Sequence, residues 1–120
     1  MSKVVLIVED NFSLLVLLCT LVRGYGYRVI EAESGQEALE KAEQQLPDLL
    51  LIDIADQPAE ALSAVKNIKN LACCKEIPVF ALTRYTNTYF HQAIQAGCNE
   101  LLERPLDFTT LKFLLKLYLD

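Results

Sequence analysis

Short uninterrupted runs of apolar residues alternate along the chain with longer segments whose apolar residues recur every three or four positions. The runs Val4–Val8 and 49–52 are apolar at successive residues, which is typical of parallel strands that are buried on both faces. Two helix starts are marked by capping residues, a Ser34 to Glu37 capping box and an N-cap at Asp107. The pattern predicts strands at 3–8, 27–32, 48–54, 77–82 and 100–102, and helices at 11–24, 34–45, 59–71, 87–96 and 107–120.

Each predicted strand is followed by a predicted helix, so the chain contains five consecutive βα units. Right-handed crossovers between parallel strands place helices on both faces of one sheet. We therefore predict an α/β fold with a doubly wound, five-stranded parallel sheet. The chain has 120 residues, 52% of them hydrophobic, and no repeat or linker divides it. Residues 1–120 are expected to form a single domain, with no output domain.

Membrane insertion is not expected from the apolar segments. The longest of them covers residues 12–22 and is interrupted by Ser13 and Thr20, whereas a membrane span needs roughly 20 predominantly apolar residues. The first apolar run ends at Glu9 and Asp10 without a small-residue cleavage site, so we interpret it as a strand and not as a signal peptide.

The charge and the cysteine content of the chain argue against two classes of protein, direct nucleic-acid binders and disulfide-bonded proteins. The chain has 11 Lys and Arg against 16 Asp and Glu, a formal charge of −5, and no basic cluster. Direct nucleic-acid binding is therefore not expected, because phosphate contacts supply most of that affinity. The four cysteines, at 19, 73, 74 and 98, lack a C-x-x-C spacing. A reduced, cytoplasmic protein is the better interpretation, and the adjacent Cys73 and Cys74 are expected to pack rather than to form a strained disulfide.

Chemically useful side chains stand at the ends of four predicted strands. Glu9 and Asp10 follow the first, Asp53 ends the third, Thr83 follows the fourth, and Arg104 comes just after the fifth. The carboxyl ends of parallel strands lie at one edge of a sheet, where α/β folds bind ligands. Three carboxylates there repel one another unless a cation joins them, and an all-oxygen set suits Mg²⁺. With a hydroxyl and a positive side chain, this arrangement suits phosphoryl transfer to an aspartate.

These residues lie in motifs that resemble the receiver domain of two-component response regulators over essentially the whole chain. The motifs are V-L-I-V-E-D-N at 5–11, L-L-L-I-D ending at Asp53, A-L-T ending at Thr83, A-G-C ending at Cys98, and Arg104-Pro105. The resemblance implies a sheet order of 2-1-3-4-5. It further implies that Mg²⁺ is bound by Glu9, Asp10, Asp53 and the backbone carbonyl of Ala55.

The resemblance also implies how such a protein acts. Asp53 would be the phosphoacceptor, taking a phosphoryl group from a histidine kinase or a phosphotransfer protein, while Thr83 and Arg104 contact the phosphoryl oxygens. The chain would not be an enzyme, except in assisting its own phosphoryl transfer and dephosphorylation. It would signal by binding a downstream protein target.

Several positions depart from the family pattern. Arg104 stands where the family has Lys, which keeps the charge and changes the geometry. Leu101 occupies the switch position, which usually carries Tyr or Phe, so the usual aromatic movement cannot occur. Ala55 and Tyr85 occupy the two positions that govern loss of the phosphoryl group, and slow self-dephosphorylation is expected from the resemblance.

Two other functions remain open. A receiver-like interaction module that no longer depends on phosphorylation is supported by Arg104 and Leu101, although the three acids argue against it. A small flavin carrier of the same topology would need a phosphate-binding loop rich in Gly, Ser and Thr after the first strand. Residues 9–12 of this chain are instead Glu-Asp-Asn-Phe, which argues against that function.

The first and last predicted helices are apolar on more than one face. The expected core stripe of the first helix consists of Leu14, Leu17, Leu18, Leu21, Val22 and Tyr25. The outward residues are expected to be Phe12, Val16 and Cys19 on the first helix and Phe113 and Leu117 on the last. We predict that these five form a face for a kinase, a phosphotransfer protein or a second copy of the chain. The surface of the fourth helix, last strand and last helix is the alternative.

Overall fold

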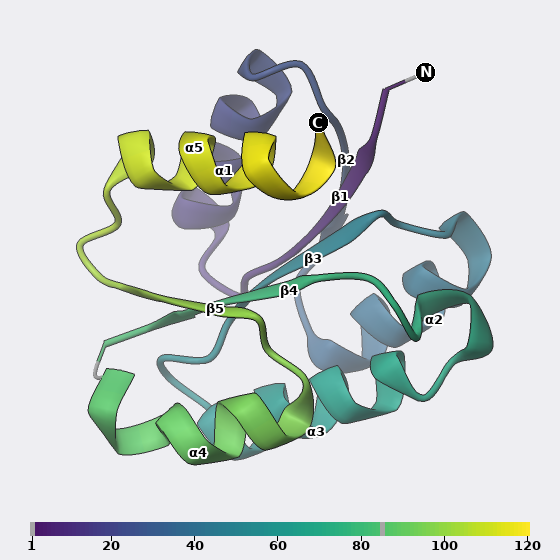
Figure 1. Cartoon of the computed structure of the whole chain (residues 1–120), viewed down its shortest axis with the longest axis vertical. Coiled ribbons are helices and arrows are strands. Elements are labelled where there is room, and N and C mark those ends of the chain that lie inside the picture. Colours follow the sequence, from purple (N-terminus) through teal and green to yellow (C-terminus); the bar gives the residue numbers. More distant parts are fainter. Residues whose placement is uncertain (1, 85) are drawn as a thin grey trace.

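The computed structural model describes residues 2–84 and 86–120 and contains one five-stranded parallel sheet in the order β2-β1-β3-β4-β5 (Figure 1). The strands are β1 Val4–Val8, β2 Arg28–Ala32, β3 Leu49–Asp53, β4 Val79–Thr83 and β5 Glu100–Glu103. The helices are α1 Phe12–Gly24, α2 Gly35–Gln45, α3 Pro58–Lys69, α4 Thr86–Ala96 and α5 Phe108–Leu119, with a 3₁₀ turn η1 at Ala72–Cys74. The predicted fold class, strand order and βα alternation are confirmed.

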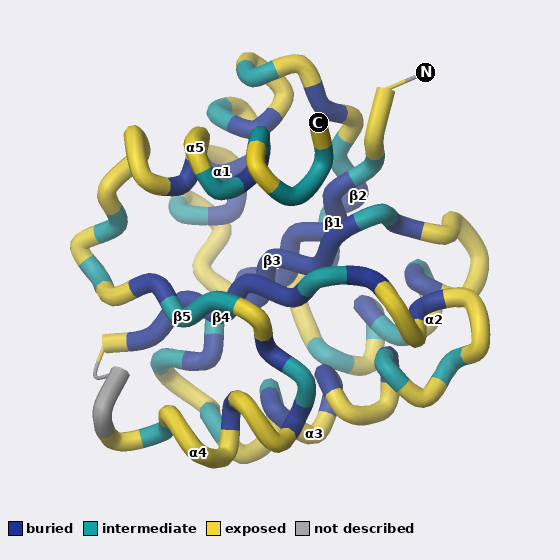
Figure 2. The backbone as a smooth tube through the Cα atoms, viewed as in Figure 1, coloured by how far each residue is buried: buried dark blue, intermediate teal, exposed yellow. Residues whose placement is uncertain are grey.

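Helices cover both faces of the sheet, α1 and α5 on one side and α2, α3 and α4 on the other (Figure 1). Successive residues of β1 enter different cores: Val5 and Ile7 pack with α1 and α5, while Leu6 and Val8 pack on the opposite side. The strands are accordingly buried over most of their length (Figure 2). Burial on both faces explains why these strands are apolar at every position rather than at alternate ones.

Side-chain caps fix where three helices begin. Oδ1 of Asn11 accepts the Leu14 N–H at 3.0 Å at the start of α1. Oγ of Ser34 accepts the Glu37 N–H at 3.1 Å, and the Glu37 carboxylate accepts the Glu33 N–H, which completes the predicted capping box. Asp107 caps α5, as predicted. Two of these caps lie next to predicted site residues, because Asn11 follows Glu9 and Asp10, and Asp107 follows Arg104 by three residues.

Helix α1 presents a different face to the core from the one predicted. Its buried residues are Leu15, Leu18, Cys19 and Val22. Cys19 was predicted to point outward and is only 2% exposed, while Leu17 was predicted to be core and is 43% exposed. Apolar residues surround this helix on both sides, so the sequence pattern allowed either orientation. The predicted exposure of Phe12, Val16, Phe113 and Leu117 is confirmed.

All four cysteines are free thiols. Burial raises the pKa of Cys19 and of Cys98 to about 11 and that of Cys74 to about 12. Cys74 packs inside the protein as expected, but Cys73 is exposed, so the prediction that both pack holds for one of them. Among the described residues, no helix is long and apolar enough to span a bilayer.

Candidate functional site

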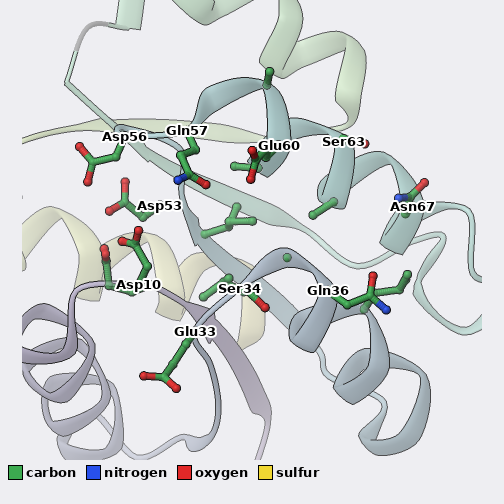
Figure 3. Close-up of a pocket in the computed structure, with 18 residues that line it drawn as sticks. Asp10, Glu33, Ser34, Gln36, Asp53, Asp56, Gln57, Glu60, Ser63 and Asn67 are labelled. Atoms are coloured by element: carbon green, nitrogen blue, oxygen red, sulfur yellow. The ribbon is translucent and has the colours of Figure 1, made fainter.

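The predicted site residues come together at the carboxyl edge of the sheet. Carboxylate oxygens of Glu9, Asp10 and Asp53 all lie within 4.8 Å of one another. Figure 3 shows Asp10 and Asp53 at the mouth of the same cleft. Thr83 ends β4 and Arg104 follows β5, one and two strands away from Asp53. The sheet order therefore places all five side chains of the prediction along one edge.

Glu9 is the most deeply buried of the three acids, with a side chain that is 0% exposed. Its Oε2 accepts the Asn11 N–H at 3.0 Å. Burial first, and the hydrogen bond to Asp53 second, raise the pKa of Glu9 from 4.5 to about 8. A carboxyl group with such a pKa is expensive to ionise where it lies, so the site favours a positive group beside it.

Asp53 ends β3 with a side chain that is 5% exposed, while Asp10 is open to solvent. Oδ1 of Asp53 accepts the Ala55 N–H at 2.8 Å. That bond fixes the carboxylate relative to the following loop and places the backbone of Ala55 at the site. The assignment of its carbonyl to a metal stays a prediction.

Arg104 contacts the acids directly. Its Nη2 donates to Oε1 of Glu9 at 3.2 Å and to Oδ2 of Asp53. The backbone N–H of Arg104 donates to the Thr83 carbonyl at 2.9 Å, so the end of β4 holds this residue in place. Nε of Arg104 is buried and has no hydrogen-bond partner among the residues described.

The remaining predicted positions have mixed outcomes. Thr83 is buried, at 1% exposure, at the end of β4. Leu101 lies in β5 opposite Ala81, and its assignment to the switch position stays a prediction. Tyr85, which was predicted to affect loss of a phosphoryl group, lies outside the described residues.

A cleft of about 550 Å³ extends from the three acids along α2 and α3 (Figure 3). Its polar lining, which was not predicted from the sequence, includes Asp56, Gln57, Glu60, Ser63 and Asn67. Asp56 pairs with Arg84 at 3.0 Å. These residues lie in the loop before α3 and on one side of that helix. The one sequence signal for this lining is the position of Asp56, three residues after Asp53. The cleft leaves the acidic site open on this side.

The donor set fits Mg²⁺, because it consists of carboxylate oxygens within coordinating reach of one another and one of the acids is open to solvent.

Three acids, a buried threonine and an arginine lie at the carboxyl edge of a doubly wound α/β sheet. This combination is typical of a signalling domain of the two-component type. The chain belongs to the response regulator receiver domain family, whose pattern matches residues 5–116. Receiver domains interact with histidine kinases and downstream targets, and they bind Mg²⁺ at this acidic site.

Curated relatives agree with this assignment. The transcriptional regulatory protein ZraR of Escherichia coli K12 is 36% identical over 109 residues, which cover 90% of this chain and 24% of ZraR. The chain thus spans about a quarter of the length of that protein. The polar-differentiation response regulator DivK of Brucella ovis is 34% identical over 120 residues, which cover 99% of this chain and 98% of DivK.

Solved structures share the fold of this chain. The chemotaxis protein CheY4 of Vibrio cholerae has a TM-score of 0.92 and 26% identity, covering 99% of this chain and 100% of that one. The receiver domain of the sensor histidine kinase PA1611 of Pseudomonas aeruginosa has a TM-score of 0.88 and 28% identity, with 98% of each chain covered. The latter structure holds a magnesium ion coordinated in its active site cleft.

Proposed function

We propose that this chain is a cytoplasmic, phosphorylatable receiver that accepts a phosphoryl group on Asp53 from a histidine kinase or phosphotransfer protein and signals by protein–protein interaction. The observation that carries the proposal is the convergence of Glu9, Asp10 and Asp53 within 4.8 Å at an open cleft. Asp53 is the acid at the end of the central strand β3, between the other two acids and the buried Thr83.

Each residue of the site has a separate chemical role in the proposed phosphoryl transfer. An oxygen of Asp53 forms a bond to phosphorus while the phosphorus–nitrogen bond of a phosphohistidine breaks, and the imidazole leaves with the electron pair. Glu9, Asp10, Asp53 and the carbonyl of Ala55 would hold Mg²⁺, which neutralises charge on the phosphoryl group when bound. Thr83 and Arg104 are assigned to the phosphoryl oxygens, as a hydroxyl donor and a cation.

The test is intact mass after incubation with Mg²⁺ and acetyl phosphate, a small phosphodonor. The wild type is expected to gain the mass of one phosphoryl group, and Asp53→Asn to gain none. Asp56→Asn is the matched control, since it removes an exposed carboxylate in the same cleft and should be labelled like the wild type. Labelling of Asp53→Asn at the wild-type level would move the acceptor to another residue.

A receiver-like interaction module that does not depend on phosphorylation is the second candidate. The contact of Arg104 with Asp53 favours it, because a guanidinium that stays on the acceptor would hinder attack on phosphorus. In that case neither the wild type nor Asp56→Asn would be labelled, and partner binding would be unchanged in Asp53→Asn.

The proposed contact face is the α1/α5 surface, which we define as Phe12 and Val16 on α1 with Phe113 and Leu117 on α5. All four side chains are exposed, and the two helices lie side by side on one face of the sheet (Figure 1). A kinase, a phosphotransfer protein or a second copy of the chain would bury them.

A further inference from the structure

Two adjacent thiols are in contact in the connection between α3 and β4. Cys73 and Cys74 end the 3₁₀ turn η1, and their sulfur atoms lie 3.6 Å apart. Cys73 is exposed, whereas Cys74 is 0% exposed. The Cys74 N–H donates to the Leu71 carbonyl at 3.0 Å, and the Cys74 carbonyl accepts the Ile77 N–H at 3.4 Å. The backbone therefore holds a dithiol in place, with one of its two residues at the surface.

A direct disulfide does not suit these two residues. Consecutive Cα atoms are about 3.8 Å apart, whereas disulfides usually join Cα atoms at least about 4.4 Å apart. The sulfurs would also have to approach from 3.6 Å to about 2.05 Å. An atom that lies between the sulfurs and bonds to both can leave them where they are.

The distance between the sulfurs limits which atom can bridge them. With bonds of about 2.3 Å, the length of a zinc–sulfur bond, an atom that joins sulfurs 3.6 Å apart has a bond angle of about 103°. A linear two-coordinate ion would need the sulfurs about 4.6 Å apart. Zinc needs four ligands, and among the described residues no third His, Cys, Asp or Glu offers a ligand atom within 4.8 Å of both sulfurs. A trivalent arsenic atom is pyramidal, with angles slightly below tetrahedral, and two thiols are enough to hold it.

We propose that Cys73 and Cys74 form a dithiol site for a trivalent arsenical, R–As(OH)₂, which bonds to both sulfurs and keeps its bond to R. Two As–O and two S–H bonds break, two As–S bonds form, and the hydroxyl groups leave with the thiol protons as water. Arsenic stays trivalent, so no oxidant or reductant takes part. The turn η1 precedes β4, so the dithiol lies at the edge of the sheet opposite Glu9, Asp10 and Asp53. The inference is therefore independent of the proposed function.

Burial of Cys74 favours a product without charge. Burial first, and the hydrogen bond with Cys73 second, raise the pKa of Cys74 to about 12. Cys74 is therefore a protonated thiol at neutral pH, and an ionic ligand would have to meet the cost of a buried thiolate. Arsenic–sulfur bonds are formally neutral, so this condensation leaves no ion inside the protein. A protonated thiol is also a poor nucleophile towards an oxidised Cys73, which again disfavours the disulfide.

The other two thiols provide controls within the same chain. Cys19 and Cys98 are buried, at 2% and 5% exposure, in the cores on opposite faces of the sheet. Cys98 lies in the same core as Cys74, and the charge of Lys69 acts on both thiols. Cys98→Ala is thus the matched control for Cys74→Ala, because each variant removes one buried thiol near the same lysine.

The experiment is a titration of the reduced chain with phenylarsine oxide, followed by mass spectrometry under non-denaturing conditions. The wild type should bind one equivalent, with the mass of the dihydroxy form less two waters. Cys73→Ser and Cys74→Ala should each bind at least about a hundredfold more weakly, because one sulfur lacks the gain from a second attachment. Cys98→Ala should stay within about twofold of the wild type, since its thiol takes no part in the bridge.

Equal affinity of Cys73→Ser and the wild type would overturn the inference. An equal loss in Cys98→Ala and Cys74→Ala would also overturn it, because the loss would then come from a loosened core.

A second measurement needs no variant. In the wild type, iodoacetamide should alkylate Cys73, and one equivalent of phenylarsine oxide should prevent this. The dithiol 2,3-dimercaptopropanol should restore alkylation, while the monothiol glutathione at the same thiol concentration should not, since two bonds to one molecule must be replaced together. Continued alkylation of Cys73 in the saturated protein would overturn the inference. Equal release by glutathione would also overturn it, because it would indicate a bond to one sulfur only.

Discussion

The carboxyl group of Glu9 has no access to solvent, and its surroundings make its ionisation unfavourable. Burial and the neighbouring Asp53 raise its pKa to about 8 from an unfolded value of 4.5. Between these values the folded state holds a proton that the unfolded state has lost. Without metal, this residue's contribution to stability is therefore largest below pH 4.5 and is lost as the pH rises towards 8.

We accordingly predict that the metal-free protein loses stability between pH 6 and pH 8, by at most about 3 kcal/mol from this group, since one proton is worth about 1.4 kcal/mol per pH unit. Glu9→Gln cannot ionise, so its loss over the same range should be smaller. Urea unfolding in EDTA at both pH values measures the difference. Equal losses in the two proteins would show that another group titrates.

At the scale of the elements, Gly35 sets the distance between α2 and α3. A Cβ on this residue would lie 2.7 Å from Cβ of Ala64, closer than side chains approach. Gly35→Ala should therefore destabilise the fold by roughly 1–3 kcal/mol in urea unfolding, through overpacking.

Two companion variants make this prediction specific. Gly24→Ala in α1 meets nothing within 4 Å and should be neutral or stabilising by roughly 0.5–1 kcal/mol, because alanine is the better helix residue. Ala64→Gly in the Gly35→Ala background should recover part of the loss by removing the clash. Equal effects of Gly35→Ala and Gly24→Ala would contradict the close approach.

The elements also show what sequence pattern can and cannot predict. Strands such as β1 and β3 were predictable because burial on both faces leaves a continuous apolar run, and the acids at their ends follow from parallel topology. The inward face of α1 was predicted wrongly at Cys19, since apolar residues on both sides remove the signal. The 3₁₀ turn η1 has three residues, which is too few for a recurring apolar pattern to be recognised. The contact of Arg104 with Glu9 and Asp53 depends on side-chain conformation, which no spacing encodes.

At the scale of the whole molecule, two groups of exposed apolar side chains among the described residues are candidate partner-binding surfaces. The first is the α1/α5 surface. The second is the pair Phe90 and Ile94, one turn apart on α4, which sequence analysis did not identify. Burying each apolar side chain against a partner contributes roughly 1.5–3 kcal/mol to the binding free energy. A charged residue introduced into the surface that binds the partner should therefore weaken binding.

We predict that Val16→Glu with Leu117→Lys abolishes self-association in sedimentation or phosphotransfer from a cognate kinase, while the fold and acetyl phosphate labelling are kept. The control pair is Phe90→Glu with Ile94→Lys on α4, which should leave these processes unchanged. The opposite result would assign the contact to α4 and its neighbours.

Asn11 is the single residue between the acids Glu9 and Asp10 and Phe12, the first residue of the α1/α5 surface. Its side chain caps α1 through the Leu14 N–H, and its own N–H binds the Glu9 carboxylate at 3.0 Å. The next residue, Phe12, is the first exposed residue of the helix. A partner bound at Phe12, as proposed, would therefore contact the chain one residue away from the hydrogen bond that orients Glu9.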